Sequence, residues 1–218
     1  MHEIEIIKLP GLTPYADALR MQDERRAAVE KGEMVNALFL LEHAPVITLG
    51  RSAHTENVLR TPEQLAEMGI DLVQTTRGGD VTYHGPGQLV AYPILNLNEW
   101  KPDIKWYLRA LEEVLIRQLA TYGLNAGRVE GYTGVWVNNA KVAAIGIGIH
   151  NWVTFHGIAL NVNPNMSHFG LIIPCGIQQK PVTSLNALLA EPPTMARAMD
   201  DFEAHFTDFF GVGATGPT

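Results

Sequence analysis

A glycine-rich segment, residues 77–88, constrains the fold more than any other part of this chain. Four of its twelve residues are glycine and one is proline, so the backbone must turn sharply twice within it. Apolar, β-forming residues precede it over residues 71–75 and follow it over residues 89–95. The segment is therefore predicted to be a loop between two strands, with a short extended stretch at residues 81–83.

This loop carries side chains that can take part in chemistry, namely Arg77, Asp80, Tyr83 and His84. A glycine-rich connection is often a simple turn, and that interpretation stays open for the loop alone. No Gly-Lys-Ser/Thr follows at the spacing of a phosphate-binding loop, and the dinucleotide fingerprint is absent as well. Loops held by rigid strands are common sites of function, so the segment is a candidate binding site.

Length and composition indicate one globular domain. The chain has 218 residues, is 46% apolar, and contains no Ser/Pro/Gly linker. We expect a single domain over residues 1–210 and a disordered tail over residues 211–218, which lack an apolar pattern. No apolar run approaches the roughly 18 residues of a membrane span, and the N-terminus does not resemble a signal peptide. A soluble cytoplasmic protein with no membrane contact is predicted.

Charge and metal-ligand patterns limit the partners. Sixteen basic against 23 acidic residues give a net charge of −7, which argues against a nucleic-acid partner. An acidic protein partner would need a local basic patch, for which Arg51, Arg60, Arg77 and Lys180 are candidates. The eight histidines are scattered without ligand spacing, so no metal site is expected.

The remaining patterns predict an α+β fold with a central mixed β-sheet and flanking helices. Strands are expected over residues 3–9, 37–41 and 46–49, and as a meander over residues 134–163. Five helices are expected, each after a capping residue: Thr13, Thr61, Asp103, Ser184 and Thr194.

Cys175, the only cysteine, is the candidate nucleophile. A lone cysteine is usually a small buried apolar residue, and it excludes an internal disulfide. Pro174 and Gly176 nevertheless place this thiol in a turn, where it could meet a carbonyl group. Because the thiolate is the reactive form, such a cysteine needs a nearby base or cation.

Lys141 is one candidate partner for that thiol. It begins an otherwise apolar strand, so it is either the solvated end of a hairpin or an amine whose pKa is lowered by an apolar wall. His84 and His156 are alternative bases. The sequence alone leaves these possibilities open.

Five motifs in order resemble the octanoyltransferases of lipoate biosynthesis, also called lipoyl(octanoyl) transferases. They are RGGDVTYHGPGQ at residues 77–88, KVAAIG at 141–146, HGIALN at 156–161, PCGI at 174–177 and VTSL at 182–185. The resemblance extends from about Leu41 to Leu189, and we find no departure at these positions.

The resemblance implies the fold of biotin and lipoate protein ligases and a monomer that needs no cofactor, neither ATP nor a metal. The octanoyl group would move from octanoyl acyl carrier protein to a lysine of lipoyl domains, in 2-oxoacid dehydrogenase complexes and in the glycine cleavage H protein. Cys175 would be the acyl-thioester nucleophile, and Lys141 would lower its pKa. The implied lining of the acyl site is Arg77, Gly78, Gly79, Asp80, Val81, Thr82, Tyr83, His84, Ala144, Ile145, Gly146, Gly157, Ile158 and Ala159.

Three other functions compete with this interpretation. An ATP-dependent lipoate or biotin ligase would share the fold, but lipoate ligases carry Asp after the loop histidine, where Gly85 stands here. A cysteine thioesterase would use Cys175 with His84 or His156 and release the fatty acid into water. A non-catalytic acyl-binding module would tolerate loss of the thiol.

Overall fold

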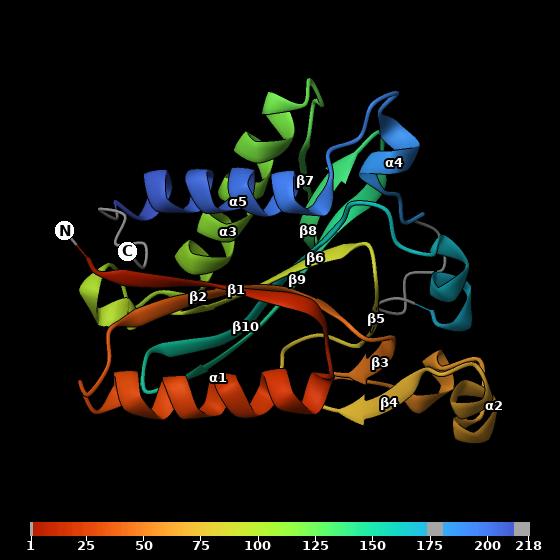
Figure 1. Ribbon diagram of the computed structural model, residues 1–218, viewed down its shortest axis with the longest axis horizontal. Coiled ribbons are helices and arrows are strands. Elements are labelled where there is room, and N and C mark those ends of the chain that lie inside the picture. Colours follow the sequence, from red (N-terminus) through yellow and green to blue (C-terminus); the bar gives the residue numbers. More distant parts are fainter. Residues whose placement is uncertain (1, 174–180, 212–218) are drawn as a thin grey trace.

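The computed structural model describes residues 2–173 and 181–211, and within them its centre is a seven-stranded mixed sheet (Figure 1). In spatial order the strands are β1 (Ile4–Thr13), β2 (Asn36–His43), β6 (Gln88–Ile94), β10 (Val153–Asn161), β9 (Ala140–His150), β8 (Tyr132–Val137) and β7 (Gly127–Val129). Only the β1–β2 pair is parallel among these described neighbours. The mixed sheet and the α+β class are confirmed.

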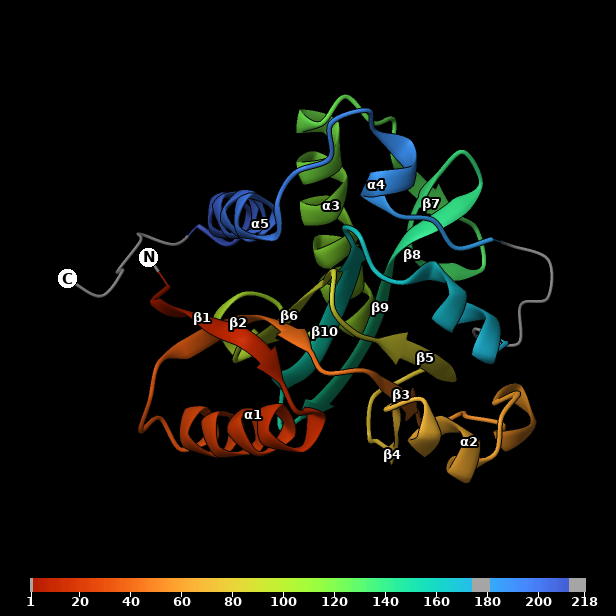
Figure 2. The ribbon, with the colours of Figure 1, turned by 45° about the vertical axis from the view of Figure 1, so that its right-hand side comes forward.

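A smaller sheet of three strands lies beside the large one. Its order is β4 (Asp71–Gln74), β3 (Val46–Leu49), β5 (Val81–His84), and α2 (Pro62–Glu67) packs on it through Leu65. In Figure 2 this sheet and α2 lie at the lower right, whereas α3 and α5 lie in the upper half of the view. The glycine-rich segment therefore contains a whole strand, β5, and then passes from the small sheet into β6 of the large one.

Helices cover both faces of the large sheet (Figure 1). On one face lies α1 (Tyr15–Glu30), over a core that includes Phe39 and Phe155. On the other lie α3 (Ile104–Thr121) and α5 (Met195–Phe210), which share a larger core with Leu111 and Phe202. No helix within the described ranges combines the length and apolarity needed to cross a bilayer.

Four of the five predicted helix caps are confirmed. Thr61 forms a capping box with Gln64, and the side chains of Asp103, Ser184 and Thr194 each accept a backbone N–H at the start of α3, α4 (Leu185–Leu188) and α5. Short 3₁₀ turns complete the description: Thr55–Asn57, Leu97–Glu99 and Met166–Leu171.

The prediction for Thr13 is wrong. This residue ends β1, and α1 begins after Pro14 without a side-chain cap. The carbonyl of Thr13 accepts the backbone N–H of Ala44 at 3.2 Å and lies 2.9 Å from His43 Nδ1. Pairing with the end of β2 thus keeps Thr13 extended. Tertiary hydrogen bonds thus override a local capping preference.

Candidate functional site

A cavity of about 450 Å³ lies between the glycine-rich segment, the β9–β10 pair and the ends of α1 and α3. Its walls come from segments spread along the sequence from Tyr15 to Ala159. The lining residues are Tyr15, residues 77–82, His84, Tyr92, Leu108, residues 131–133, Lys141, residues 144–147 and residues 156–159.

This cavity brings together most of the residues that the sequence singled out. Lys141 lines it, and so does every member of the expected acyl-site lining except Tyr83. Tyr83 is fully buried behind the wall, with its hydroxyl 2.7 Å from His168 Nδ1. Cys175 lies outside the described residues.

Two ends of the cavity differ in exposure. We call Tyr15, His84, Tyr92 and His156 the buried end, because each is at most 7% exposed. We call Gly131, Tyr132, Thr133 and Lys141 the exposed end, since the first three are exposed and Lys141 is intermediate.

The charged residues of the loop shape its backbone. Arg77 donates from Nε and Nη2 to Thr48 Oγ1 of β3, at 3.1 and 2.9 Å, and from Nη2 to the Thr48 carbonyl at 2.6 Å. Asp80 accepts the backbone N–H of His54 at 3.1 Å and Asn57 Nδ2 at 2.6 Å. Both side chains are buried, so these bonds fix the loop against β3 and against the turn at residues 54–57.

The glycines of the cavity allow backbone segments to approach closely. The Gly78 N–H donates to the Ile147 carbonyl at 2.8 Å, and a Cβ on Gly146 would lie 3.1 Å from the Gly78 carbonyl oxygen. A Cβ on Gly157 would lie only 2.1 Å from the Ala91 carbonyl oxygen. Gly146 and Gly157 still line the cavity, but the space of their missing Cβ atoms is taken by neighbouring backbone.

Gly85 is required by the packing of Tyr83. A Cβ at residue 85 would lie 2.0 Å from the Tyr83 hydroxyl oxygen and 2.6 Å from its Cζ. Since Tyr83 is fully buried and bonded to His168, it has little room to move aside. Any larger side chain at residue 85 would displace this ring.

The histidines of the buried end are held neutral. Burial, with smaller effects from the charges of His43, Arg77 and His156, lowers the pKa of His84 to about 3. Burial, with the charges of Arg77 and Arg51, lowers the pKa of His156 to about 3 as well. Bases with a pKa this low hold a thiol proton poorly at neutral pH, which disfavours a mechanism that relies on either ring.

His156 is also conformationally unusual. Its φ of 56° lies in the left-handed region although the residue belongs to β10. Its N–H donates to Gln22 Oε1 of α1 at 2.7 Å, while its Nδ1 is buried and has no hydrogen-bond partner among the described residues. Backbone strain of this kind often occurs at functional sites.

Lys141 belongs to the exposed end and is held by its neighbours. Its Nζ lies 4.9 Å from the centre of the Trp136 ring, within the distance of a cation–π contact. Its backbone N–H donates to the Pro181 carbonyl at 2.8 Å, and its carbonyl accepts the Thr183 N–H at 2.9 Å. The chain that follows residues 174–180 therefore runs beside Lys141.

Sequence reasoning missed several lining residues. They are Tyr15, Tyr92, Leu108, Gly131, Tyr132, Thr133 and Ile147. None belongs to a recognisable motif, and only Ile147 adjoins one. In the described part of the chain, no three His, Cys, Asp or Glu side chains gather into a group that could hold a metal ion.

Comparisons with known proteins agree on one family. A family model, the lipoyl protein ligase A/B catalytic domain, matches residues 14–207. An octanoyltransferase of Solibacter usitatus is 48% identical over 200 residues, which cover 92% of this chain and 90% of the relative.

Solved structures extend the likeness to the fold. A putative lipoate protein ligase of T. acidophilum with bound lipoic acid has a TM-score of 0.76 at 14% identity, covering 100% of this chain and 89% of that one. Lipoate-protein ligase A bound with ATP also gives 0.76, at 15% identity and the same coverage. The expected lipoate-ligase-like fold is confirmed, and the chain belongs to the lipoyl protein ligase A/B catalytic domain family and, within it, to the octanoyltransferases.

Proposed function

We propose that this protein transfers an octanoyl group from octanoyl acyl carrier protein to a lysine of lipoyl domains, through a thioester on Cys175. The observation that carries the proposal is the position of Lys141, which lies in the wall of a cavity built from the octanoyltransferase motifs. The relative from Solibacter usitatus, which is 48% identical to this chain, bears the name octanoyltransferase.

The first half of the reaction would load the enzyme. Neutral Lys141 takes the thiol proton of Cys175, and the thiolate attacks the thioester carbonyl of the donor. The carbon–sulfur bond to the donor's phosphopantetheine breaks, and the ammonium of Lys141 returns the proton to the departing thiolate. The ring of Trp136 supports the ammonium form of Lys141 between these two proton transfers.

The second half would unload the enzyme. The amine of the acceptor lysine attacks the Cys175 thioester, an amide forms, and the cysteine thiol is regenerated. Exchange of one thioester for another is nearly balanced in free energy, and formation of the amide is favourable. The proposed reaction therefore needs neither ATP nor a metal.

The cavity supports the acyl half of this proposal. Burial of an eight-carbon chain contributes about 0.8 kcal/mol per methylene, or about 5 kcal/mol in total. We infer that the chain lies along β9, between Lys141 at the exposed end and Ile145 and Gly146 further along the strand.

For the protein partners we infer octanoyl acyl carrier protein as donor. As acceptors we infer the lipoyl domains of 2-oxoacid dehydrogenase complexes and the glycine cleavage H protein.

The described chain on both sides of residues 174–180 supports access of Cys175 to the cavity. On one side, Ile173 donates its N–H to the carbonyl of Asn57, and the Asn57 side chain donates to Asp80 in the cavity wall. On the other side, the carbonyl of Pro181 accepts the backbone N–H of Lys141.

One observation separates this proposal from a lipoate ligase. The lipoate ligases carry Asp after the loop histidine, and the Tyr83 ring leaves no space for any side chain at residue 85 here. The expected ligase residue is thus incompatible with the packing of this loop.

Mass spectrometry of an acceptor domain tests the proposal. The enzyme is mixed with octanoyl acyl carrier protein and an unmodified lipoyl domain, without ATP, and the domain is expected to gain one octanoyl group. If modification instead requires octanoate and ATP, the protein is a ligase. If free octanoate appears at the same rate with and without acceptor, it is a thioesterase.

A further inference from the structure

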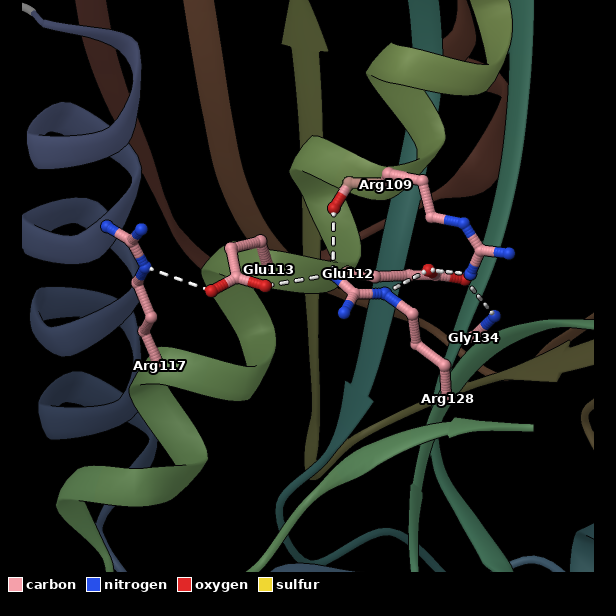
Figure 3. Close-up of polar contacts among 6 residues, drawn as sticks. All are labelled: Arg109, Glu112, Glu113, Arg117, Arg128 and Gly134. Atoms are coloured by element: carbon pink, nitrogen blue, oxygen red, sulfur yellow. Dashed lines mark hydrogen bonds and ion pairs between the residues drawn. The ribbon is translucent and has the colours of Figure 1, made fainter. Parts of the chain in front are cut away.

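A buried carboxylate links α3 to β8 beside the exposed end of the cavity (Figure 3). The side chain of Glu112, on α3, is 2% exposed. Its Oε2 lies 2.6 Å from Arg109 Nη1 and 2.8 Å from Arg128 Nε, and its Oε1 accepts the backbone N–H of Gly134 at 3.3 Å. The Arg109 contact lies within α3, whereas the contacts with Arg128 of β7 and Gly134 of β8 join the helix to the β7–β8 region.

Gly134 in turn lies near the Lys141 side chain. A Cβ on Gly134 would stand 2.6 Å from the Ala143 carbonyl oxygen and 3.5 and 3.6 Å from Cε and Cδ of Lys141. The residue has a φ of 122°, which a larger residue rarely adopts. A side chain at residue 134 would therefore contact the Lys141 alkyl chain, and glycine leaves that space to the lysine.

The same strand places the other neighbour of the amine. Trp136 follows Gly134 by two residues in β8, so both occupy the same face of the strand. The Trp136 ring meets the Nζ of Lys141 at 4.9 Å. A shift of β8 would therefore move both of the surfaces that orient Lys141.

Two walls of the cavity depend on this link as well. Leu108 lines the cavity from α3, one turn before Glu112, and residues 131–133 line it from the start of β8. The bond between Glu112 and Gly134 therefore joins the helix and the strand that supply these walls.

We propose that Glu112 is a positioning residue for Lys141. By accepting the Gly134 N–H while two arginines hold its other oxygen, it fixes β8, the strand that places Gly134 and Trp136 beside the lysine side chain. This inference rests on the proposed role of Lys141 as the partner of the Cys175 thiol.

The neighbouring Glu113 is a matched comparison. It lies on the same helix and also binds Arg128, at 2.9 Å, but its second partner is Arg117 at 3.3 Å and its side chain is 34% exposed. Figure 3 places it on the side of α3 away from Gly134.

The pH dependence of Cys175 alkylation by iodoacetamide measures the effect. Because Cys175 is the only cysteine, the readout is unambiguous and independent of octanoyl transfer. Glu112→Asp keeps the charge but shortens the reach to Gly134, and we expect it to raise the apparent pKa of the thiol by about one unit. Glu112→Gln keeps the reach and an acceptor oxygen, and is expected to alkylate within about threefold of wild type at pH 7. Glu113→Asp is expected to match wild type.

Each outcome supports or overturns the role of Glu112. Thermal unfolding confirms that every variant is folded. Wild-type alkylation in Glu112→Asp would overturn the proposal, and so would a larger effect of Glu112→Gln than of Glu112→Asp. Lys141→Ala separates the two levels of inference. If it leaves alkylation unchanged, the pairing of Lys141 with Cys175 is wrong. If it shifts the thiol pKa while Glu112→Asp does not, only the role of Glu112 is wrong.

Discussion

The two ends of the cavity hold their ionisable groups in opposite ways. At the buried end, His84 and His156 lie among aromatic rings, and burial lowers the pKa of each to about 3. At the exposed end, Lys141 lies near Gly134 and beside the indole ring of Trp136, and its side chain is partly open to solvent. Because burial disfavours both histidines as the base, Lys141 is the group that we propose for this role.

The difference also concerns rigidity. The buried end is braced by hydrogen bonds: His84 Nδ1 lies 2.7 Å from Gln88 Oε1, and His43 Nε2 lies 2.7 Å from the Tyr92 hydroxyl. The exposed end combines Lys141 of β9 with the start of β8, and the carboxylate of Glu112 holds β8 at Gly134. We therefore expect substitutions to reduce activity at the exposed end and stability at the buried end.

The largest expected effect is on catalysis at the exposed end. Lys141→Ala should lower the rate of octanoyl transfer by about 10²–10⁴-fold, the usual contribution of a positioned proton-transfer group. Lys141→Arg should stay inactive, because a guanidinium keeps its proton at neutral pH. The measurement is the initial rate of lipoyl-domain modification, and a loss of less than about tenfold in Lys141→Ala would contradict the account.

Next in size is a loss of stability beside the buried end. Gly85→Ala places a Cβ 2.0 Å from the Tyr83 hydroxyl oxygen. Overpacking at a rigid site should lower the free energy of unfolding by about 3 kcal/mol, measured by urea denaturation. Gly127→Ala is the control, since nothing lies within 4 Å of its added Cβ. Equal stabilities of the two variants would show that the Tyr83 ring gives way.

A smaller effect concerns pH. The folded-state pKa of His156, about 3, is below its ordinary value of 6.5, so the unfolded chain binds the extra proton between these values. Stability should fall as pH drops from about 6 to 4, by up to about 1.4 kcal/mol per pH unit for this histidine. His156→Asn, which tolerates the positive φ, should reduce that slope in urea denaturation. An unchanged slope would mean that His156 does not titrate on unfolding.

The smallest expected effect is at the rim of the exposed end. Tyr132 is 36% exposed, so Tyr132→Ala should change the free energy of unfolding by less than about 1 kcal/mol. Because the ring lines the cavity, the variant should raise the KM for the octanoyl donor by about threefold, roughly 0.6 kcal/mol. A large loss of stability with an unchanged KM would reverse the contrast between the two ends.

Local signals predicted local structure well. The capping residues Thr61, Asp103 and Thr194 marked helix starts because a side-chain oxygen and a backbone N–H three residues away suffice to define them. The meander of β8, β9 and β10 was equally visible, since adjacent strands joined by short turns carry their own pattern.

Long-range pairing was the part that sequence could not provide. Nothing local distinguishes β3 and β5, which form a separate small sheet, from the strands of the large sheet. β7 was missed because three residues are too few to display alternation.

The residues of the site also fall into a predictable group and an unpredictable one, because only some of them belong to local motifs. Motifs located the loop and the lysine strand, whereas Tyr15, Leu108 and Tyr132 reach the cavity only through tertiary packing. Glu112 resembles any helical glutamate in sequence, and its burial beside Gly134 follows from how α3 packs on β8.

The central claim is that a thioester forms on Cys175 with the help of Lys141. Intact-mass spectrometry after mixing with octanoyl acyl carrier protein tests it most directly. The wild-type chain should gain one octanoyl group on the peptide that contains Cys175, Cys175→Ala should gain none, and Lys141→Ala should gain it far more slowly. A wild-type enzyme that remains unmodified while it turns over would contradict the covalent mechanism.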